Sequence, residues 1–183
     1  MENLQTTSEK RKLGKAVVKL LVKISAIALL VYVLLHFVFG IFVTHDNNMY
    51  PSLRDGDFIL TVRLMEAYRE DVVVYTVNNY SGIDSATYKE TRVGRVIAVA
   101  GDTVDISEEG GYTVNGNIPY ETIYYETFPD PSGWITYPYT LQEGEYFVLS
   151  DMREGFADSR TYGAITRKQL MGKCVFIMRH RGF

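Results

Sequence analysis

Apolar and polar residues divide the chain into a basic tip, an uncharged run and a longer domain of mixed composition. Residues 1–23 hold six basic and two acidic side chains, whereas residues 24–43 hold no charge and are rich in leucine, valine, isoleucine and phenylalanine. Twenty residues of helix rise about 30 Å, which matches the hydrocarbon core of a bilayer. The pattern therefore predicts a transmembrane helix over 24–43, between a tip over 1–23 and a folded domain over 44–183.

Short apolar runs rich in β-branched and aromatic residues recur through this domain. They cover 58–62, 72–77, 93–99 and 146–149, and turn sequences such as Asn115-Gly116 separate them. Such runs are typical of strands, and an Asn-Gly pair between two of them predicts a tight hairpin. Residues 120–139 are rich in tyrosine and proline and predict a long, partly irregular connection. We therefore expect a mainly β domain built of antiparallel strands in a sheet or barrel.

Six basic residues lie before the uncharged run, and none follows it directly. The positive-inside rule then places the N-terminus in the cytoplasm and the β domain outside the cell membrane. A cleaved secretory signal is the alternative, but it requires a shorter apolar core and a small-residue cleavage site. The end of the run, Phe-Gly-Ile-Phe-Val at 39–43, offers no such site. We therefore expect a single-pass protein with an extracellular domain.

The composition argues against several kinds of function. The formal net charge is −3, whereas nucleic-acid-binding domains carry a strong positive excess. The single cysteine, Cys174, cannot form an internal disulfide, and the three histidines lack metal-ligand spacing. We expect no nucleic-acid partner, no metal and no cofactor.

Three segments resemble motifs of the bacterial type I signal peptidases, the S26 family. Residues 49–57 read Met-Tyr-Pro-Ser-Leu-Arg-Asp-Gly-Asp, residues 95–104 read Arg-Val-Ile-Ala-Val-Ala-Gly-Asp-Thr-Val, and a third segment runs from Ser150-Asp151-Met152-Arg153 through Asp158-Ser159-Arg160 to Gly163. They follow the order of the family behind the expected N-terminal anchor. The resemblance implies the fold of a membrane-anchored serine protease with a Ser–Lys dyad, which cleaves signal peptides at the outer face of the membrane.

The two positions of the dyad differ from the family pattern. The nucleophilic serine is expected immediately before Met49, where this chain has Asn48, and the lysine immediately before Arg95, where it has Gly94. Acyl transfer by this route needs a hydroxyl that attacks and a base that takes its proton. A carboxamide is a poor nucleophile and glycine has no side chain, so we expect a catalytically inactive family member.

Two alternatives remain open from the sequence. An active signal peptidase with a displaced dyad would need Ser52 and Lys89. Ser52 lies in a predicted turn beside Pro51, and Lys89 lies five residues before Gly94, an odd offset that puts it on the opposite face of a strand. The third interpretation is an unrelated membrane-tethered β domain whose motifs match by chance.

The remaining candidate residues fall into two groups. The degenerate cleft is expected to hold Asp46, Asn48, Met49, Pro51, Gly94 and Phe156. Asp46 would place negative charge where an oxyanion needs hydrogen-bond donors. Structural roles are expected for Gly56, Asp57, Gly101, Asp102, Asp151, Asp158, Ser159, Arg160 and Gly163, with Asp151 and Arg160 forming a charge-assisted pair.

The resemblance also indicates partners. Signal-peptidase-like proteins without the dyad resemble those encoded in Gram-positive pilus loci, where they accompany pilin and sortase genes. The implied role is a chaperone-like assembly factor for pilin subunits, acting beside a sortase. A cleft built to hold an extended chain can still bind one by adding it as a strand to a sheet edge.

Overall fold

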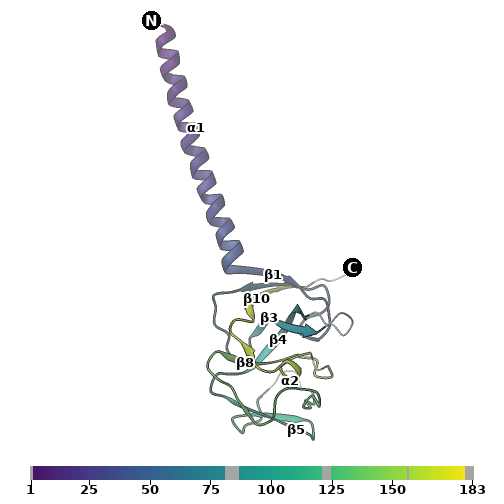
Figure 1. The fold of residues 1–183 in the computed structure, drawn as a ribbon. Coiled ribbons are helices and arrows are strands. Elements are labelled where there is room, and N and C mark those ends of the chain that lie inside the picture. Colours follow the sequence, from purple (N-terminus) through teal and green to yellow (C-terminus); the bar gives the residue numbers. More distant parts are fainter. Residues whose placement is uncertain (1, 81–86, 121–124, 156, 180–183) are drawn as a thin grey trace. The chain divides into compact units, whose positions relative to one another are not determined.

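The computed structural model describes residues 2–80, 87–120, 125–155 and 157–179. Side chains are described from residue 12 onward, except that of Tyr80. The chain divides into two compact units, Met1–Val38 and Phe39–Phe183. The first unit is helical, and the second contains the strands (Figure 1).

The first unit is one helix, α1 (Glu2–Val33), which ends in a π-helical turn, η1 (Leu34–Val38). Residues 12–38 are long and apolar enough to cross a membrane. Near the C-terminal end of the helix the rings of Tyr32 and His36 stack, with centroids 5.7 Å apart. Tyrosine is enriched at the boundary between membrane and water.

The predicted helix over 24–43 ends five residues early. Its last residues form β1 (Phe39–Val43), which pairs antiparallel with β2 (Phe58–Val62). A Cβ at Gly40 would lie 2.7 Å from Thr61 Oγ1, so the glycine lets the two strands come close. An apolar run does not by itself distinguish helix from strand, and the pairing with β2 decides between them. The folded domain therefore begins at Phe39 and not at residue 44.

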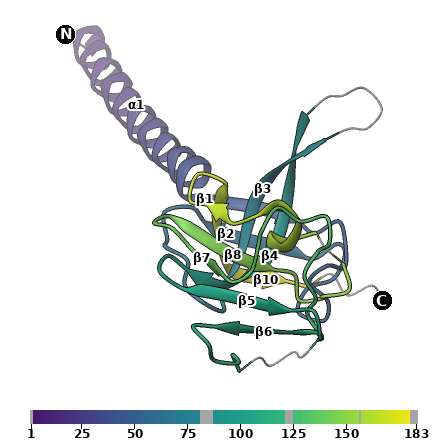
Figure 2. The ribbon, with the colours of Figure 1, turned by 60° about the horizontal axis from the view of Figure 1, so that its bottom comes forward.

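The second unit contains a seven-stranded sheet of order β1-β2-β10-β3-β4-β8-β9 and a three-stranded sheet of order β6-β5-β7 (Figure 2). Every strand pair is antiparallel, which confirms the mainly β prediction. The remaining elements are β3 (Val72–Tyr80), β4 (Thr87–Val99), β5 (Thr103–Ser107), β6 (Gly111–Val114), β7 (Tyr139–Thr140), β8 (Glu145–Leu149), α2 (Ser159–Tyr162), β9 (Ile165–Thr166) and β10 (Leu170–Met178).

The local predictions for the domain agree with these elements. All four predicted runs lie in strands, and Asn115 and Gly116 both adopt positive φ, at 55° and 76°, in a hairpin turn closed by Val114 and Asn117. Within 120–139, the described residues form no helix or strand before Tyr139. The sequence therefore predicted these strands and this turn correctly.

Alternation along β3 sorts its side chains between two apolar clusters. Val73, Tyr75 and Val77 pack on one side with Val96, Tyr146 and Val148, whereas Val74 packs on the other with Met49, Leu53 and Ile59. A third cluster joins the inner faces of β5 and β8 through Val104, Ile106, Phe147 and Leu149. The two strands β3 and β4 thus form the centre of the domain.

A buried ion pair lies under the loops that follow β8. The carboxylate of Asp158 accepts from the backbone N–H of Ser150 and of Arg160, and from the Arg160 guanidinium at 2.9 Å. Both side chains are fully buried. Arg160 also donates to the carbonyl oxygen of Arg153, so its charge is held by both the carboxylate and the backbone.

Replacement of Asp158 should destabilise the domain strongly. Asp158→Ala leaves the Arg160 charge buried without its partner, and we expect the free energy of unfolding to fall by about 3–5 kcal/mol. Chemical unfolding of the detergent-solubilised chain, followed by circular dichroism, measures the change. As a control, Glu109→Ala on the exposed β5–β6 turn should change it by less than about 0.5 kcal/mol. Equal effects of the two substitutions would contradict the assignment.

Candidate functional site

Asn48 lies in the loop that joins β1 to β2. Met49 and Leu53 anchor this loop, since both are buried against Ile59 and the Leu53 N–H donates to the Met49 carbonyl. At the end of the loop Gly56 adopts a φ of 83°, and its N–H donates to the carbonyl of Thr44. The first motif therefore forms a fixed loop, with Asn48 at a defined place on it.

The side chain and backbone of Asn48 are both bound by Asp46. Asn48 Nδ2 donates to Asp46 Oδ2 at 2.7 Å, and the Asn48 N–H donates to Asp46 Oδ1 at 3.2 Å. In acyl transfer, a backbone N–H at the nucleophile commonly stabilises the oxyanion. Here a carboxylate already accepts from that donor, and its charge would repel an oxyanion. Asp46 thus holds both the side chain and the N–H of Asn48.

Gly94 lies on β4 opposite Val73 of β3, where the space for a side chain is already filled. A Cβ at this position would lie 2.5 Å from Val148 Cγ1 and 3.2 Å from Tyr75 Cε1. A lysine here would require Val148 and Tyr75 to move. Gly94 itself offers no basic side chain, and the space beside it is taken by atoms of Val148 and Tyr75 and by the carbonyl oxygen of Leu149.

Tyr75 does not replace that base. Its side chain is fully buried, and its hydroxyl has no hydrogen-bond partner among the described residues. Burial, and then the charge of Asp158, raise the pKa of Tyr75 far above its ordinary value. The phenol therefore stays protonated and cannot accept a proton.

Arg92 links the two motif positions. Its guanidinium lies 3.8 Å from Asp46 Oδ2 and 2.8 Å from Glu90 Oε1. Arg92 is the cross-strand partner of Tyr75 and stands two residues before Gly94, on the same face of β4. The structure thus brings the Asp46–Asn48 pair to the part of β4 that carries Gly94. The sequence reasoning missed Arg92, although its offset of two from Gly94 in a predicted strand was a usable signal.

Neither residue of the displaced-dyad alternative is placed for catalysis. Ser52 Oγ lies 3.1 Å from Arg95 Nη2, and Asp151 holds that guanidinium at 2.7 and 2.8 Å. A guanidinium stays protonated and cannot serve as a base for Ser52. Lys89 is exposed, and the unbroken register of β3 with β4 puts it on the face opposite Gly94.

The expected pair between Asp151 and Arg160 does not form. Asp151 binds Arg95, whereas Arg160 binds Asp158. Asp158 is the N-cap of α2 and stands two residues before Arg160, so this local pairing wins over the longer one. The prediction was wrong because Arg95, from the second motif, binds Asp151, while Asp158 binds Arg160.

The other predicted structural residues lie in turns and loop contacts. Asp102 accepts from Arg69, Asn115 and the N–H of Val99, next to Gly101 at a φ of 86°. Asp57 accepts from the N–H of Arg54, Ser159 Oγ from the N–H of Val148, and Gly163 ends α2 at a φ of 82°. Pro51 follows a cis peptide bond in the Asn48 loop. Phe156 lies outside the described residues.

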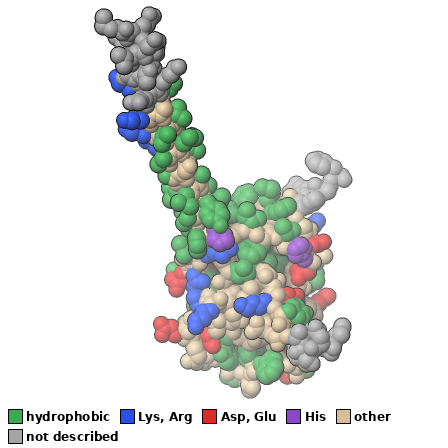
Figure 3. Space-filling view, turned by 45° about the horizontal axis from the view of Figure 1, so that its top comes forward, with side chains coloured by type: hydrophobic (Ala, Val, Ile, Leu, Met, Phe, Trp, Pro, Cys, Tyr) green, Lys and Arg blue, Asp and Glu red, His purple; other side chains and the backbone are tan. Residues whose placement is uncertain are grey.

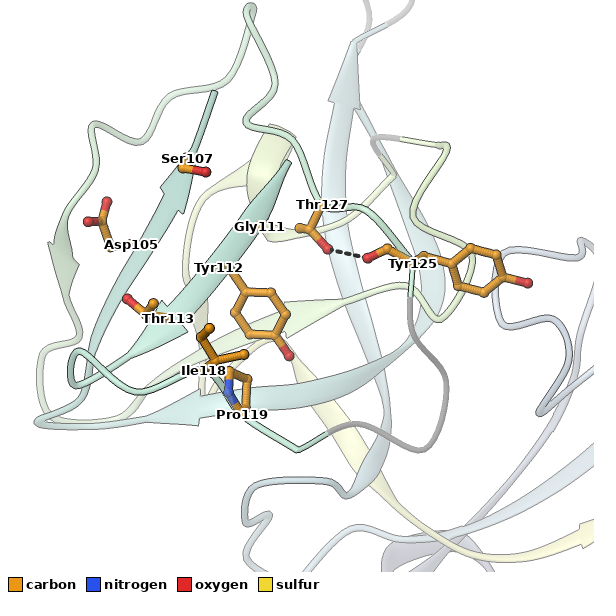
Figure 4. Close-up of a pocket in the computed structure, with 9 residues that line it drawn as sticks. All are labelled: Asp105, Ser107, Gly111, Tyr112, Thr113, Ile118, Pro119, Tyr125 and Thr127. Atoms are coloured by element: carbon orange, nitrogen blue, oxygen red, sulfur yellow. Dashed lines mark hydrogen bonds between the residues drawn. The ribbon is translucent and has the colours of Figure 1, made fainter. Parts of the chain in front are cut away.

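Two cavities of the domain do not include the two positions of the family dyad. One, of about 250 Å³, lies on the small sheet and is lined by residues that include Asp105, Tyr112 and Ile118 (Figure 4). The other, of about 570 Å³, is lined by residues that include Glu66, Glu143 and Arg167. Neither is lined by Asn48 or Gly94. Among the described residues, no group of three or more His, Cys, Asp or Glu side chains could hold a metal ion.

Comparison with known proteins agrees with the motifs. The family model for signal peptidase, peptidase S26, matches residues 17–179. This chain belongs to the peptidase S26 family. It is 31% identical over 156 residues to signal peptidase I of Bacillus caldolyticus, covering 76% of this chain and 79% of that protein. It is 28% identical over 192 residues to signal peptidase I T of Bacillus subtilis strain 168, covering 96% and 91%.

A solved structure of a signal peptidase I from Enterococcus faecalis V583 is also similar. The TM-score is 0.43 and the sequence identity 22%, over 60% of this chain and 97% of that one. Membership of the S26 family rests on the family model and the sequence relatives. It rules out the interpretation of an unrelated β domain.

Substitution of Gly94 in this S26 protein should expose the close packing around it. Gly94→Ala places a methyl group against Val148, and we expect a loss of about 1–3 kcal/mol in unfolding free energy from overpacking. Combined with Val148→Ala, the loss should be smaller than the sum of the single losses by about 1 kcal/mol, because the removed atoms make room. Chemical unfolding measures all three variants.

A matched glycine provides the control. Gly111 lies on β6, and a Cβ there would meet only Ser107 Oγ, at 3.9 Å. Gly111→Ala should therefore leave the unfolding free energy nearly unchanged. A Gly94→Ala variant as stable as Gly111→Ala would show that the space beside β4 is open.

Proposed function

We propose that this chain is a non-catalytic member of the signal peptidase family that binds an extended polypeptide segment. One observation carries the proposal: Val148 and Tyr75 fill the space at Gly94 where the family's lysine would extend. Without a base, and with a carboxamide in place of the nucleophilic hydroxyl, the acyl-transfer route has neither of its reacting groups.

The expected catalytic loss is large. In a well-studied serine protease, removal of the nucleophile or its base costs about 10⁶ in rate. This chain lacks both groups at the positions of the family dyad and adds the Asp46 carboxylate at the Asn48 N–H. The relatives named as signal peptidase I support membership of the family. The changes at Asn48 and Gly94 support a role in binding without cleavage.

A free strand edge next to this site supports binding. β3 pairs with β4 along its whole length, from Val72 opposite Arg95 to Tyr80 opposite Thr87. β8 pairs with β4 only between Arg95 and Val99. Within the described part of the chain, the outer edge of β4 over 87–94 therefore has no strand partner. An extended segment can add to such an edge through main-chain hydrogen bonds. Arg92 and its partner Asp46 flank this edge.

We propose a pilin segment as the bound chain, with a sortase acting nearby, so that the protein serves as a membrane-anchored assembly factor in surface pilus biogenesis. The support is the resemblance to dyad-lacking proteins of Gram-positive pilus loci, together with the helix that could anchor the domain. Held beside the membrane, a binding domain would present the extended subunit without cutting it.

Restoring the dyad alone should not restore cleavage. We expect Asn48→Ser with Gly94→Lys to leave a secretory precursor uncut, because Asp46 still accepts from the residue 48 N–H and Val148 still blocks the lysine. Addition of Asp46→Ser and Val148→Ala removes both obstacles and should raise the rate above that of the double variant. The assay uses the detergent-solubilised full chain, with signal peptidase I of Bacillus caldolyticus as the positive control.

The same assay tests the alternative of an active enzyme with an atypical dyad. Cleavage of the precursor by the unmodified chain that disappears in Ser52→Ala or Lys89→Ala would contradict the non-catalytic proposal. We expect the unmodified chain and both single variants to be equally inactive.

A charge at position 48 should block binding without unfolding the domain. We expect Asn48→Arg to weaken capture of pilin subunits at least tenfold, about 1.4 kcal/mol, because its side chain would project beside the β4 edge. Asn117→Arg makes the same chemical change on the exposed turn after β6 and should leave capture unchanged. Pull-down with purified pilin candidates measures binding, and circular dichroism checks the fold. Equal capture by both variants would show that the interface does not include position 48.

A further inference from the structure

The uncharged part of the helix is too short to cross a bilayer by itself. Residues 24–38 rise about 22 Å, whereas the hydrocarbon core is about 30 Å thick. The chain then enters β1, the edge strand of the large sheet. Open strand edges do not occur in hydrocarbon, because their backbone groups would lack partners. A span of about twenty residues that ends at Val38 must therefore begin near Lys19.

The helix turns before residue 24 have two different faces. At 3.6 residues per turn, lysines spaced by three, four and four positions fall within one arc of about 80°. These are Lys12, Lys15, Lys19 and Lys23, which we call the lysine stripe. Val17 and Leu21 lie on the opposite face. Figure 3 shows the basic side chains toward the N-terminal end of the helix and the apolar surface after them.

The lysine stripe is available for an external partner. All four lysines are exposed, and no ion pair joins them to an acidic side chain among the described residues. Lysine stems can lie along apolar surface while the ammonium groups reach toward water or headgroups. One-sided lysines thus let the other face of the same turns contact acyl chains.

We propose that the lysine stripe binds the headgroups of anionic phospholipids at the N-terminal side of the membrane. Because the span begins near Lys19, the middle of the stripe stands at headgroup depth, where phosphate is abundant. The two middle lysines of the stripe stand about 6 Å apart along the helix axis, within the depth of one headgroup layer, and the long stems of the first and last lysines can reach toward the same layer. The face with Val17 and Leu21 then lies against acyl chains and supplies the missing length of the span.

The proposal is tested by lipid selectivity of the full chain. The chain is reconstituted in phosphatidylcholine vesicles that contain a trace of spin-labelled phosphatidylglycerol or phosphatidylcholine. The motionally restricted component of the electron paramagnetic resonance spectrum gives the relative association of each lipid. We expect phosphatidylglycerol to associate about fivefold more than phosphatidylcholine, because one lysine near an anionic surface has an effect of this size. The preference should fall in high salt, since salt screens the charges.

A rearranged variant separates the stripe from simple net charge. Lys15→Val, Val17→Lys, Lys19→Leu and Leu21→Lys together keep the composition but put lysines on both faces. This variant should lose most of the preference. Lys15→Gln with Lys19→Gln keeps the apolar face intact and should lower the preference without affecting insertion, so the test remains decisive if the rearranged chain fails to insert.

Two outcomes would overturn the proposal. One is equal lipid selectivity for the unmodified chain and the Lys15→Gln, Lys19→Gln variant. The other is no lipid preference at all; photocrosslinks in cells from position 15 to an acidic membrane protein would then assign the stripe to a protein partner.

Discussion

The contact of Val148 with the backbone of Gly94 is the constraint on which the centre of the domain depends. β8 packs its valine against β4 at a distance that leaves no room for a Cβ at Gly94. Tyr75 from β3 closes the same space from the neighbouring strand. The result is a continuous apolar core at the place where a signal peptidase of the Ser–Lys type needs a buried amine. The packing at Gly94 and the loss of catalysis that we propose thus have the same physical cause.

The charged groups around this core complete the change. Asp46 accepts from Asn48 and meets Arg92, and Asp151 fixes Arg95 beside Ser52. Each of these carboxylates has a cation or amide close by, and none is positioned to activate a hydroxyl. A charge-assisted network of this kind stabilises a loop geometry. These motif residues therefore hold one another in place around Asn48 and Gly94, two positions that carry neither a hydroxyl nor an amine.

The membrane helix and the β domain share the same stretch of apolar sequence. β1 takes its last five residues for pairing with β2, which leaves a helical part that is short for a bilayer. The one-sided lysines before it offer a physical solution, since the same turns can meet both acyl chains and headgroups. The start of β1 at Phe39 thereby determines that the part of the helix in contact with lipid begins near residue 19.

The sequence by itself determined the β domain, the tight turn at Asn115-Gly116 and the family, because alternation, turn chemistry and ordered motifs are local properties of the chain. It also identified Asn48 and Gly94 as the positions that differ from the family's dyad. Only the tertiary structure decided that residues 39–43 form a strand, that Asp151 pairs with Arg95 and not with Arg160, and that Val148 fills the space at Gly94. These outcomes depend on which distant segments meet, since strand pairing, ion-pair choice and core packing are settled by competition between partners far apart in the chain.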